Sequence, residues 1–444
     1  MKKEKSQFVC QECGHSSPKW LGRCPSCGAW NSMVEEVHVL KATAGRASLK
    51  FSKPLSEIEE EGLDRLSTGF SKLDEALGGG LVRGQALLLA GEPGIGKSTL
   101  LLQVCEYFSR AEGKSLYVSG EESPSQLRIR ARRLGITASD LHVLAETNLE
   151  NLLEVLYEEK PRLLAVDSVQ TLYSSTLESS PGSVAQVREC TFRLIEACKD
   201  LNTVLFLVGQ VNKEGVVAGP KVLEHMVDTV LYFEGERFSF HRVVKVLKNR
   251  FGASGDVAVF KMASGGLEEV QEPSAFFLQE RVSSPGSVVF PHTEGMRPIL
   301  LEVQSLTIHA LYTTPQRRTQ GFDANRLSII LAVLEKEAKL FTRDRDVFVK
   351  VVGGVDVEEP AIDLAVALSV VSSVKEKPVE DVLVFGELGL SGEIRAVHFA
   401  HERLKEGRRF GFKRALVPRG CAVEVEGMEV YPVRHIREAI EYLT

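Results

Sequence analysis

The sequence predicts an α/β protein with a parallel sheet at its centre, a small cysteine-rich ribbon before it and an α+β domain after it. Three observations support this fold class. Strands and helices alternate over residues 57–270, which is typical of a parallel sheet covered by helices. The glycine-rich segment 91–99 lies between two apolar runs. Two Cys-x-x-Cys pairs lie in residues 1–36, and the element pattern changes again over 271–444.

Length and composition limit the class of protein. With 444 residues, the chain is long enough for about three domains. No apolar run approaches the roughly twenty residues that span a bilayer, and no apolar segment follows the first basic residues as in a secretory signal. We therefore expect a cytoplasmic protein with no membrane partner. Because the net charge is −6, nucleic-acid binding would have to use local basic surface.

The cysteines of the first 36 residues have the spacing of a zinc ribbon. They form two Cys-x-x-Cys pairs ten residues apart, namely Cys10, Cys13, Cys24 and Cys27. Two such turns can place four thiolates around one Zn²⁺, and four thiolates leave no open position for catalysis. Two disulfides or a redox dithiol are the alternatives, and a reducing compartment disfavours both. Residues 37–56 lack periodicity, so we expect a flexible linker.

The glycine-rich segment is a phosphate-binding loop between a strand and a helix. It consists of Gly91, Glu92, Pro93, Gly94, Ile95, Gly96, Lys97, Ser98 and Thr99. Backbone N–H groups of such a loop point at phosphate oxygens, and the following helix N-terminus adds partial positive charge. Lys97 can reach the β- and γ-phosphates of ATP, and Ser98 can ligate Mg²⁺.

Polar residues follow three further strands expected at this sheet. Asp167 ends the apolar run 163–167, as in a Walker B strand, where it can hold Mg²⁺ through water. Glu121 or Glu122 is a candidate to orient the attacking water, and Gln210 is a candidate γ-phosphate sensor. Ligands gather at the carboxyl ends of parallel strands. The alternative for the glutamates is a cap on the next helix.

Two segments after Gln210 are also candidates for function. We expect residues 213–226 to form a glycine-rich loop. Lys248 and Arg250 alternate along an extended segment, so both cations point to one side. Facing a neighbouring subunit's triphosphate they would stabilise transition-state charge, and facing a channel they would bind DNA phosphate. A solvated turn is the remaining alternative.

Four features in order resemble the RadA (Sms) family of bacterial DNA-repair proteins: the cysteine ribbon, GEPGIGKST, the LYVSGEES strand and KNRFG. The resemblance covers essentially the whole chain. It implies a RecA-like ATPase core close to that of DnaB-type helicases, a homohexameric ring, and DNA-stimulated ATP hydrolysis. It also implies branch migration on single-stranded and branched DNA alongside the RecA recombinase. Among the candidate residues, it favours Glu121 as the water-activating carboxylate.

Residues 271–444 resemble the proteolytic domain of Lon proteases, which use a Ser–Lys dyad. Aligning the proline before the Lon serine with Pro360 puts Ala361 at the nucleophile, and aligning the following glycine-rich turn puts Arg403 at the lysine. Alanine has no nucleophile and arginine does not deprotonate. We therefore expect a Lon-like fold without peptidase chemistry, which serves as a scaffold for the ring. The basic stretch 314–320 is either a DNA contact or an ordinary exposed loop.

The leading hypothesis is therefore a DNA-dependent ATPase or helicase of recombinational repair, with ATP, Mg²⁺ and Zn²⁺ as cofactors. An ATP-dependent Lon-type protease is the first alternative, and Ala361 and Arg403 oppose it. The second is a nucleotide-gated signalling scaffold, in which ATP only controls assembly.

Overall fold

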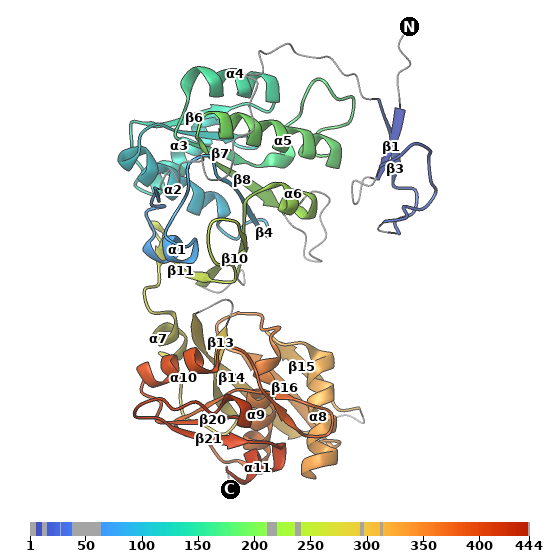
Figure 1. Ribbon diagram of the computed structural model, residues 1–444, viewed down its shortest axis with the longest axis vertical. Helices are drawn as coiled ribbons and strands as arrows, with labels where there is room; N and C mark the ends of the chain where they lie inside the picture. Colours follow the sequence, from blue (N-terminus) through green and yellow to red (C-terminus); the bar gives the residue numbers. More distant parts are fainter. Residues whose placement is uncertain are drawn as a thin grey trace, which may run out of the picture. The chain divides into compact units, whose positions relative to one another are not determined.

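The computed structural model describes residues 6–10, 16–26, 28–37, 64–210, 220–235, 241–293, 297–310 and 314–442 (Figure 1). By their internal contacts, the residues divide into two compact units. One consists of Met1–Glu234, Val244–Ser254 and Lys261–Glu269, and the other of Gly235–Val243, Gly255–Phe260 and Val270–Thr444. The expected domain bounds at 36, 56 and 270 stay predictions, and the expected linker lies largely outside the described residues.

The N-terminal ribbon is a small antiparallel sheet. Its described strands run in the order β2-β1-β3, with bounds Ser16–Ser17, Ser6–Cys10 and Met33–Val37. Cys10, Cys24 and Met33 form its buried core. So small a core supplies little hydrophobic stabilisation, and such segments usually depend on a bound metal.

The segment with the predicted phosphate-binding loop belongs to a sheet of nine described strands in the order β12-β11-β10-β9-β4-β8-β7-β5-β6. Within it, β9, β4, β8, β7, β5 and β6 form a parallel group, each paired with the next. In chain order the bounds are β4 Ala86–Gly91, β5 Ser115–Ser119, β6 Leu141–Ala145, β7 Leu163–Asp167, β8 Val204–Gln210, β9 Thr229–Glu234, β10 His241–Asn249, β11 Val257–Ala263 and β12 Gly266–Glu269.

Helices cover this sheet, and strand alternation divides its core in two. Leu88, Val118 and Val166 pack with the apolar faces of α4 and α5, while α2 contacts β5 and β7. The helix bounds are α1 Ser71–Ala76, α2 Lys97–Ala111, α3 Pro124–Arg133, α4 Leu149–Glu159, α5 Val184–Asp200 and α6 Pro220–Met226, with a short 3₁₀ turn, η2, at Val169–Thr171. Strands β4, β5, β7 and β8 are nearly all buried, so they form the centre of this sheet's core.

The C-terminal unit contains a mixed sheet of seven described strands in the order β15-β16-β14-β13-β17-β20-β21. Helix α9 packs on β13 and β14, and α8 packs on α9. The strands are β13 Ser287–Thr293, β14 Pro298–His309, β15 Arg317–Gln320, β16 Arg345–Val351, β17 Val382–Val384, β20 Arg414–Pro418 and β21 Glu429–Val433, with a separate hairpin of β18 Glu387–Leu388 and β19 Ile394–Arg395. The helices are α7 Pro273–Leu278, α8 Ala324–Ala338, α9 Asp363–Lys375, α10 Ala400–Arg409 and α11 Ile436–Glu441, with 3₁₀ turns η3 Pro360–Ile362 and η4 Arg419–Cys421.

One local expectation is wrong. Residues 213–226 were expected to be a loop, but the second half of that segment is helix α6, Pro220–Met226. Proline at the first helical position tolerates its missing N–H, and Val-Leu-Glu-His-Met after it has ordinary helix-forming residues. Residues 211–219 lie outside the described part of the chain.

Candidate nucleotide site

The phosphate-binding loop joins β4 to α2. Gly96 is the residue before the helix and has φ 121°, a conformation that strongly favours glycine. A Cβ there would also lie 3.2 Å from Cε of Met262. The loop therefore keeps its backbone close to neighbouring structure, and the unsatisfied N–H groups of the first α2 turn point outward at its start.

Lys97 is the most buried cation of the loop. Its exposed fraction is 6%, and its Nζ donates to the carbonyl oxygens of Gly91 at 2.6 Å and Glu92 at 2.8 Å. Burial lowers the pKa of Lys97 to about 8, against the opposing attraction of Asp167, Glu121 and Glu92. The ammonium thus lies over the loop and donates to loop carbonyls, whereas it would donate to phosphate oxygens of a bound nucleotide.

Glu121 is held at the carboxyl edge of the sheet by two neighbours. Its Oε1 accepts from Nε2 of Gln210 at 2.9 Å and from Oγ of Ser168 at 3.1 Å. Ser168 was not among the predicted site residues, although its place directly after Asp167 puts it at the same strand end. The structure thus brings Glu121 and Gln210 together at the carboxyl edge of the sheet, across β7, which lies between β5 and β8.

Glu122 has a different environment. Its carboxylate pairs with Arg130 of α3, and its backbone N–H donates to Oγ of Ser119 at 2.9 Å. Helix α3 is capped by Ser123, whose Oγ accepts from the N–H of Gln126. The alternative that a glutamate caps this helix is therefore wrong: Ser123 is the cap, and Gln126 three positions later completes the capping box.

These side chains surround one pocket of about 300 Å³. Its lining combines loop residues, strand-end residues and two arginines of α3, including Gly94, Ser98, Asp167, Gln210, Arg130 and Arg133. The lysine, the helix N-terminus and the hydroxyls suit a triphosphate, and a serine hydroxyl with a carboxylate suits Mg²⁺. The residues present therefore fit Mg²⁺-ATP: the loop would hold the phosphates, and Ser98 and Asp167 the cation.

Lys248 and Arg250 lie near the end of β10 and contact the same neighbouring segment. Nζ of Lys248 donates to the carbonyls of Glu224 and Val227, each at 2.7 Å. Arg250 pairs with Asp228 at 3.2 Å, and its side chain is 54% exposed. Both cations thus point to one side, as expected, and the solvated-turn alternative does not describe Lys248.

The predicted zinc ligands are only partly visible. Cys10 and Cys24 are buried together, at 0% and 1% exposure, whereas Cys13 and Cys27 lie outside the described residues. Among the residues that are described, no group of three or more His, Cys, Asp or Glu is arranged to hold a metal. The two visible cysteines share one small core, which fits a common tetrahedral site.

The region that aligns with the Lon dyad is a buried ion pair. Arg403, 2% exposed, pairs with Glu359, and Nδ1 of His292 lies 2.7 Å from the same carboxylate. Burial would raise the pKa of Glu359, but hydrogen bonds from His292 and Arg403 hold it below its ordinary value. Ala361, two residues after Glu359, is 1% exposed. The cluster is therefore a buried ion pair, and the position that aligns with the Lon serine, Ala361, carries no nucleophile.

Comparisons with known proteins identify the family. The model of a rubredoxin metal binding domain matches residues 8–35, an AAA domain matches 53–216, and subunit ChlI of Mg-chelatase matches 328–420. DNA repair protein RadA of Aquifex aeolicus is 63% identical over the full length of both chains. The chain belongs to the RadA family.

Other RadA proteins agree over nearly the whole chain. Those of Pseudomonas aeruginosa and Bacillus subtilis are 48% and 46% identical, with 100% and 99% of each chain covered. A KaiC-like protein from Pyrococcus horikoshii is 19% identical and has a TM-score of 0.40, covering 47% of this chain and 99% of its own.

Membership of the RadA family confirms several predictions. The α/β fold class, the zinc ribbon and the phosphate-loop ATPase domain are all confirmed, and with the AAA domain the family identifies an ATP-hydrolysing enzyme. Within the described ranges, no helix has the length and apolar character needed to cross a bilayer.

Proposed function

We propose that this RadA-family chain is a DNA-stimulated ATPase motor of recombinational repair. The observation that carries the proposal is the position of Glu121, fixed by Gln210 and Ser168 beside the pocket that holds Lys97 and Asp167. A carboxylate held at this edge can orient the attacking water. Ser98 and Asp167 would hold Mg²⁺, which would supply positive charge against the charge that develops during phosphoryl transfer.

Gln210 is the residue through which we propose that DNA binding affects the nucleotide site. Its side chain holds Glu121, and its backbone ends strand β8. A shift of this strand end would turn the carboxylate away from the water, so hydrolysis can respond to what binds beyond β8. We propose this contact as the switch by which DNA stimulates turnover.

Lys248 and Arg250 support assembly into a homohexameric ring. Arg250 is half-exposed although it is paired with Asp228, so it remains accessible to a second molecule. Cations supplied by a neighbouring subunit stabilise the transition state of phosphoryl transfer, with effects of about 10³ to 10⁵ in rate. A cyclic arrangement supplies such a neighbour to every site.

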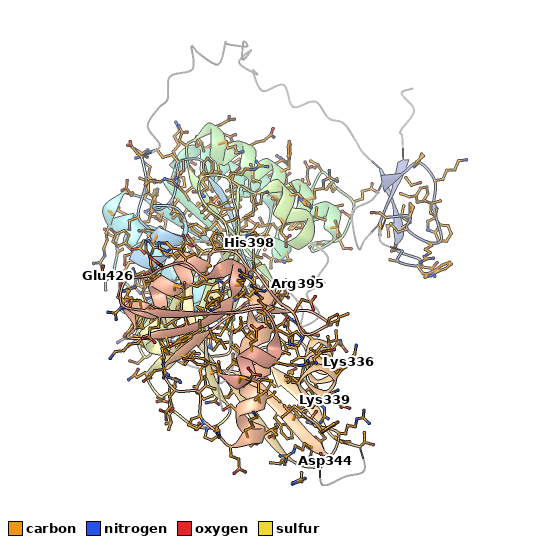
Figure 2. The ribbon with its side chains drawn as sticks, turned by 60° about the horizontal axis from the view of Figure 1, so that its bottom comes forward. Lys336, Lys339, Asp344, Arg395, His398 and Glu426 are labelled. Carbon is orange, nitrogen blue, oxygen red and sulfur yellow. The ribbon has the colours of Figure 1, made fainter. Side chains whose placement is uncertain are left out.

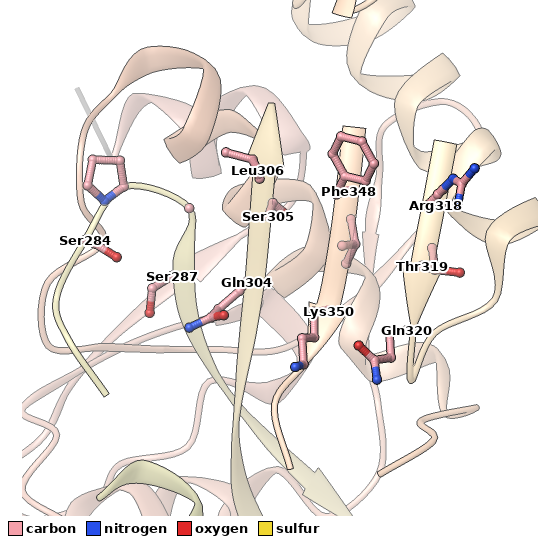
Figure 3. A pocket seen from close by; sticks show the side chains of 13 residues that line it. Ser284, Ser287, Gln304, Ser305, Leu306, Arg318, Thr319, Gln320, Phe348 and Lys350 are labelled. Carbon is pink, nitrogen blue, oxygen red and sulfur yellow. The ribbon is translucent and has the colours of Figure 1, made fainter. Parts of the chain in front are cut away.

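A basic depression in the C-terminal unit supports DNA contact. It has a volume of about 540 Å³, and Figure 3 shows its side chains on β14, β16 and β15 and on the segment that enters β13. Across the three strands β14, β16 and β15, Phe348 lies opposite both Leu306 and Arg318. Two residues further along, Lys350 lies opposite both Gln304 and Gln320. The described residues that line it include cations and an aromatic ring but no carboxylate. Such a surface suits phosphates and unstacked bases.

The motor would act on single-stranded and branched DNA and promote branch migration with RecA. The protease alternative has no support at Ala361 and Arg403, because the first lacks a nucleophile and the second is a buried, paired cation.

The test compares ATP turnover and branched-DNA processing by the full-length protein. We expect single-stranded DNA to stimulate turnover, and RecA-made joint molecules to be extended with ATP but not with a non-hydrolysable analogue. Glu121→Gln should bind ATP and fail in both assays. Native mass spectrometry should show six subunits. Turnover indifferent to DNA would contradict the motor and favour the scaffold alternative.

A further inference from the structure

A buried tyrosine contacts the carboxylate proposed to hold Mg²⁺. The hydroxyl of Tyr117 donates to Oδ2 of Asp167 at 2.6 Å, across 50 positions of sequence. Tyr117 is 0% exposed. The nucleotide pocket is lined by Asp167 but not by Tyr117, so the phenol approaches the carboxylate from inside the protein.

Strand alternation places this contact. Strands β5 and β7 are parallel, with Tyr117 opposite Ala165 and Ser119 opposite Asp167. Side chains two residues apart share a face of the sheet, and Tyr117 is therefore on the same face as Asp167, one step further from the strand end. A shorter side chain at that position would not reach the carboxylate, whereas the length of tyrosine does.

The hydrogen bond has a fixed direction. An ionised carboxylate only accepts, so the phenol donates. The backbone carbonyl of Asp167 accepts from the N–H of Gly120 at 3.1 Å. Asp167 is thus fixed at both its main chain and one carboxylate oxygen.

The other oxygen remains available to the pocket. No hydrogen bond to Oδ1 of Asp167 is formed within the described part of the chain. A tyrosine that occupies Oδ2 selects one orientation of the carboxylate and leaves Oδ1 for a water of the metal. Outer partners of this kind orient metal-binding carboxylates, and their loss typically costs about 10–100-fold in metal affinity or activity.

We propose that Tyr117 is a positioning residue that orients Asp167 toward the Mg²⁺ of bound ATP. The proposal rests on the ATP site described under the proposed function. It assigns a role in the nucleotide site to a core residue that does not line the pocket. Tyr117→Phe removes only the hydroxyl and keeps the ring that fills the core.

The experiment titrates Mg²⁺ against binding of a fluorescent ATP analogue to the full-length protein. We expect Tyr117→Phe to raise the Mg²⁺ midpoint about tenfold, with nucleotide affinity in EDTA unchanged. The midpoint of a titration does not depend on how much of the protein is folded, so partial loss of folded material does not mask the result. Tyr173→Phe is the matched control, because the Tyr173 hydroxyl forms no hydrogen bond in the described structure.

The Asp167→Asn variant distinguishes a failure of the positioning role of Tyr117 from a failure of the metal site. If wild type needs Mg²⁺ and Asp167→Asn raises the midpoint while Tyr117→Phe stays within twofold of wild type, the positioning role is overturned and the ATP site stands. If wild type binds nucleotide without any Mg²⁺ dependence, the metal site itself fails. In the Asp167→Asn background, Tyr117→Phe should add nothing, since coupled residues are not additive. An undiminished tenfold effect there would also overturn the proposal.

Discussion

Nε2 of Gln210 and Oε1 of Glu121 lie 2.9 Å apart, although 89 positions separate them in sequence. The pair joins the ends of β8 and β5, and it distinguishes the two glutamates that follow β5. Glu121 is held at the pocket by neutral donors, whereas Glu122 is bound to the guanidinium of Arg130.

Glu121→Gln should lower ATP turnover by about 10² to 10⁴, the usual contribution of a positioned base, and leave ATP binding intact. Glu122→Gln should cost much less, because its carboxylate is engaged with Arg130. Steady-state turnover and equilibrium nucleotide binding measure both effects. Equal losses in the two variants would contradict the assignment of Glu121.

Lys97 should make nucleotide binding pH-dependent. Its pKa of about 8 means that the free protein loses this proton as the pH rises above 8, while a triphosphate requires the cation. Affinity should therefore be level near pH 7, where little proton uptake is expected, and fall above pH 8, where uptake should approach one proton per nucleotide bound. Calorimetry in buffers of different ionisation enthalpy counts that proton. Lys97→Arg should be flat over the same range, since guanidinium stays charged.

Gly120→Ala should damage the site by crowding. A Cβ at this position would lie 1.8 Å from Oγ1 of Thr171, so the strand end that carries Glu121 would have to move. We expect a loss of about 1–3 kcal/mol of stability and weaker turnover. Gly265→Ala is the matched control, because nothing lies within 4 Å of its Cβ. Thermal unfolding and turnover compare the two; a neutral Gly120→Ala would contradict the packing described here.

Arg403→Met should destabilise the C-terminal unit by about 3–5 kcal/mol, because it leaves the carboxylate of Glu359 buried without its cation. Hydrogen exchange of α10 and β13 in the full-length protein measures the loss. Arg409→Met removes an exposed pair with Glu272 and should cost about 0.2–1 kcal/mol. Arg403→Lys should not create peptidase activity, since the aligned nucleophile position is Ala361.

Arg318→Gln and Lys350→Gln should weaken DNA binding uniformly across sequences. Each lost phosphate contact should reduce the slope of log affinity against log salt by about 0.7 for single strands. Lys336 and Lys339, labelled in Figure 2, lie outside the depression and provide the control substitutions. Unchanged salt slopes in the Arg318 and Lys350 variants would show that DNA binds elsewhere.

The sequence was sufficient where chemistry is local. The bounds of β7 follow from an apolar run, and the loop before α2 follows from glycine spacing. Contacts between distant segments were not accessible in the same way. The Tyr117–Asp167 contact, for example, depends on the register of β5 and β7. The cap of α3 by Ser123 is local, and the glutamine three residues after this serine was a usable signal for it. Periodicity shows which face of a strand or helix a residue occupies but not which side chains it contacts there.

Lys248 connects the anchoring of α6 with the binding of a phosphate from outside. An ammonium has three hydrogens, and two of them already serve the carbonyls of Glu224 and Val227 at the end of α6. One hydrogen is left for an incoming phosphate, so a phosphate that accepts a second one must displace a carbonyl at that helix terminus. Such a contact loosens the anchoring of α6, and by linkage a firmer anchoring of α6 weakens that phosphate contact by the same factor.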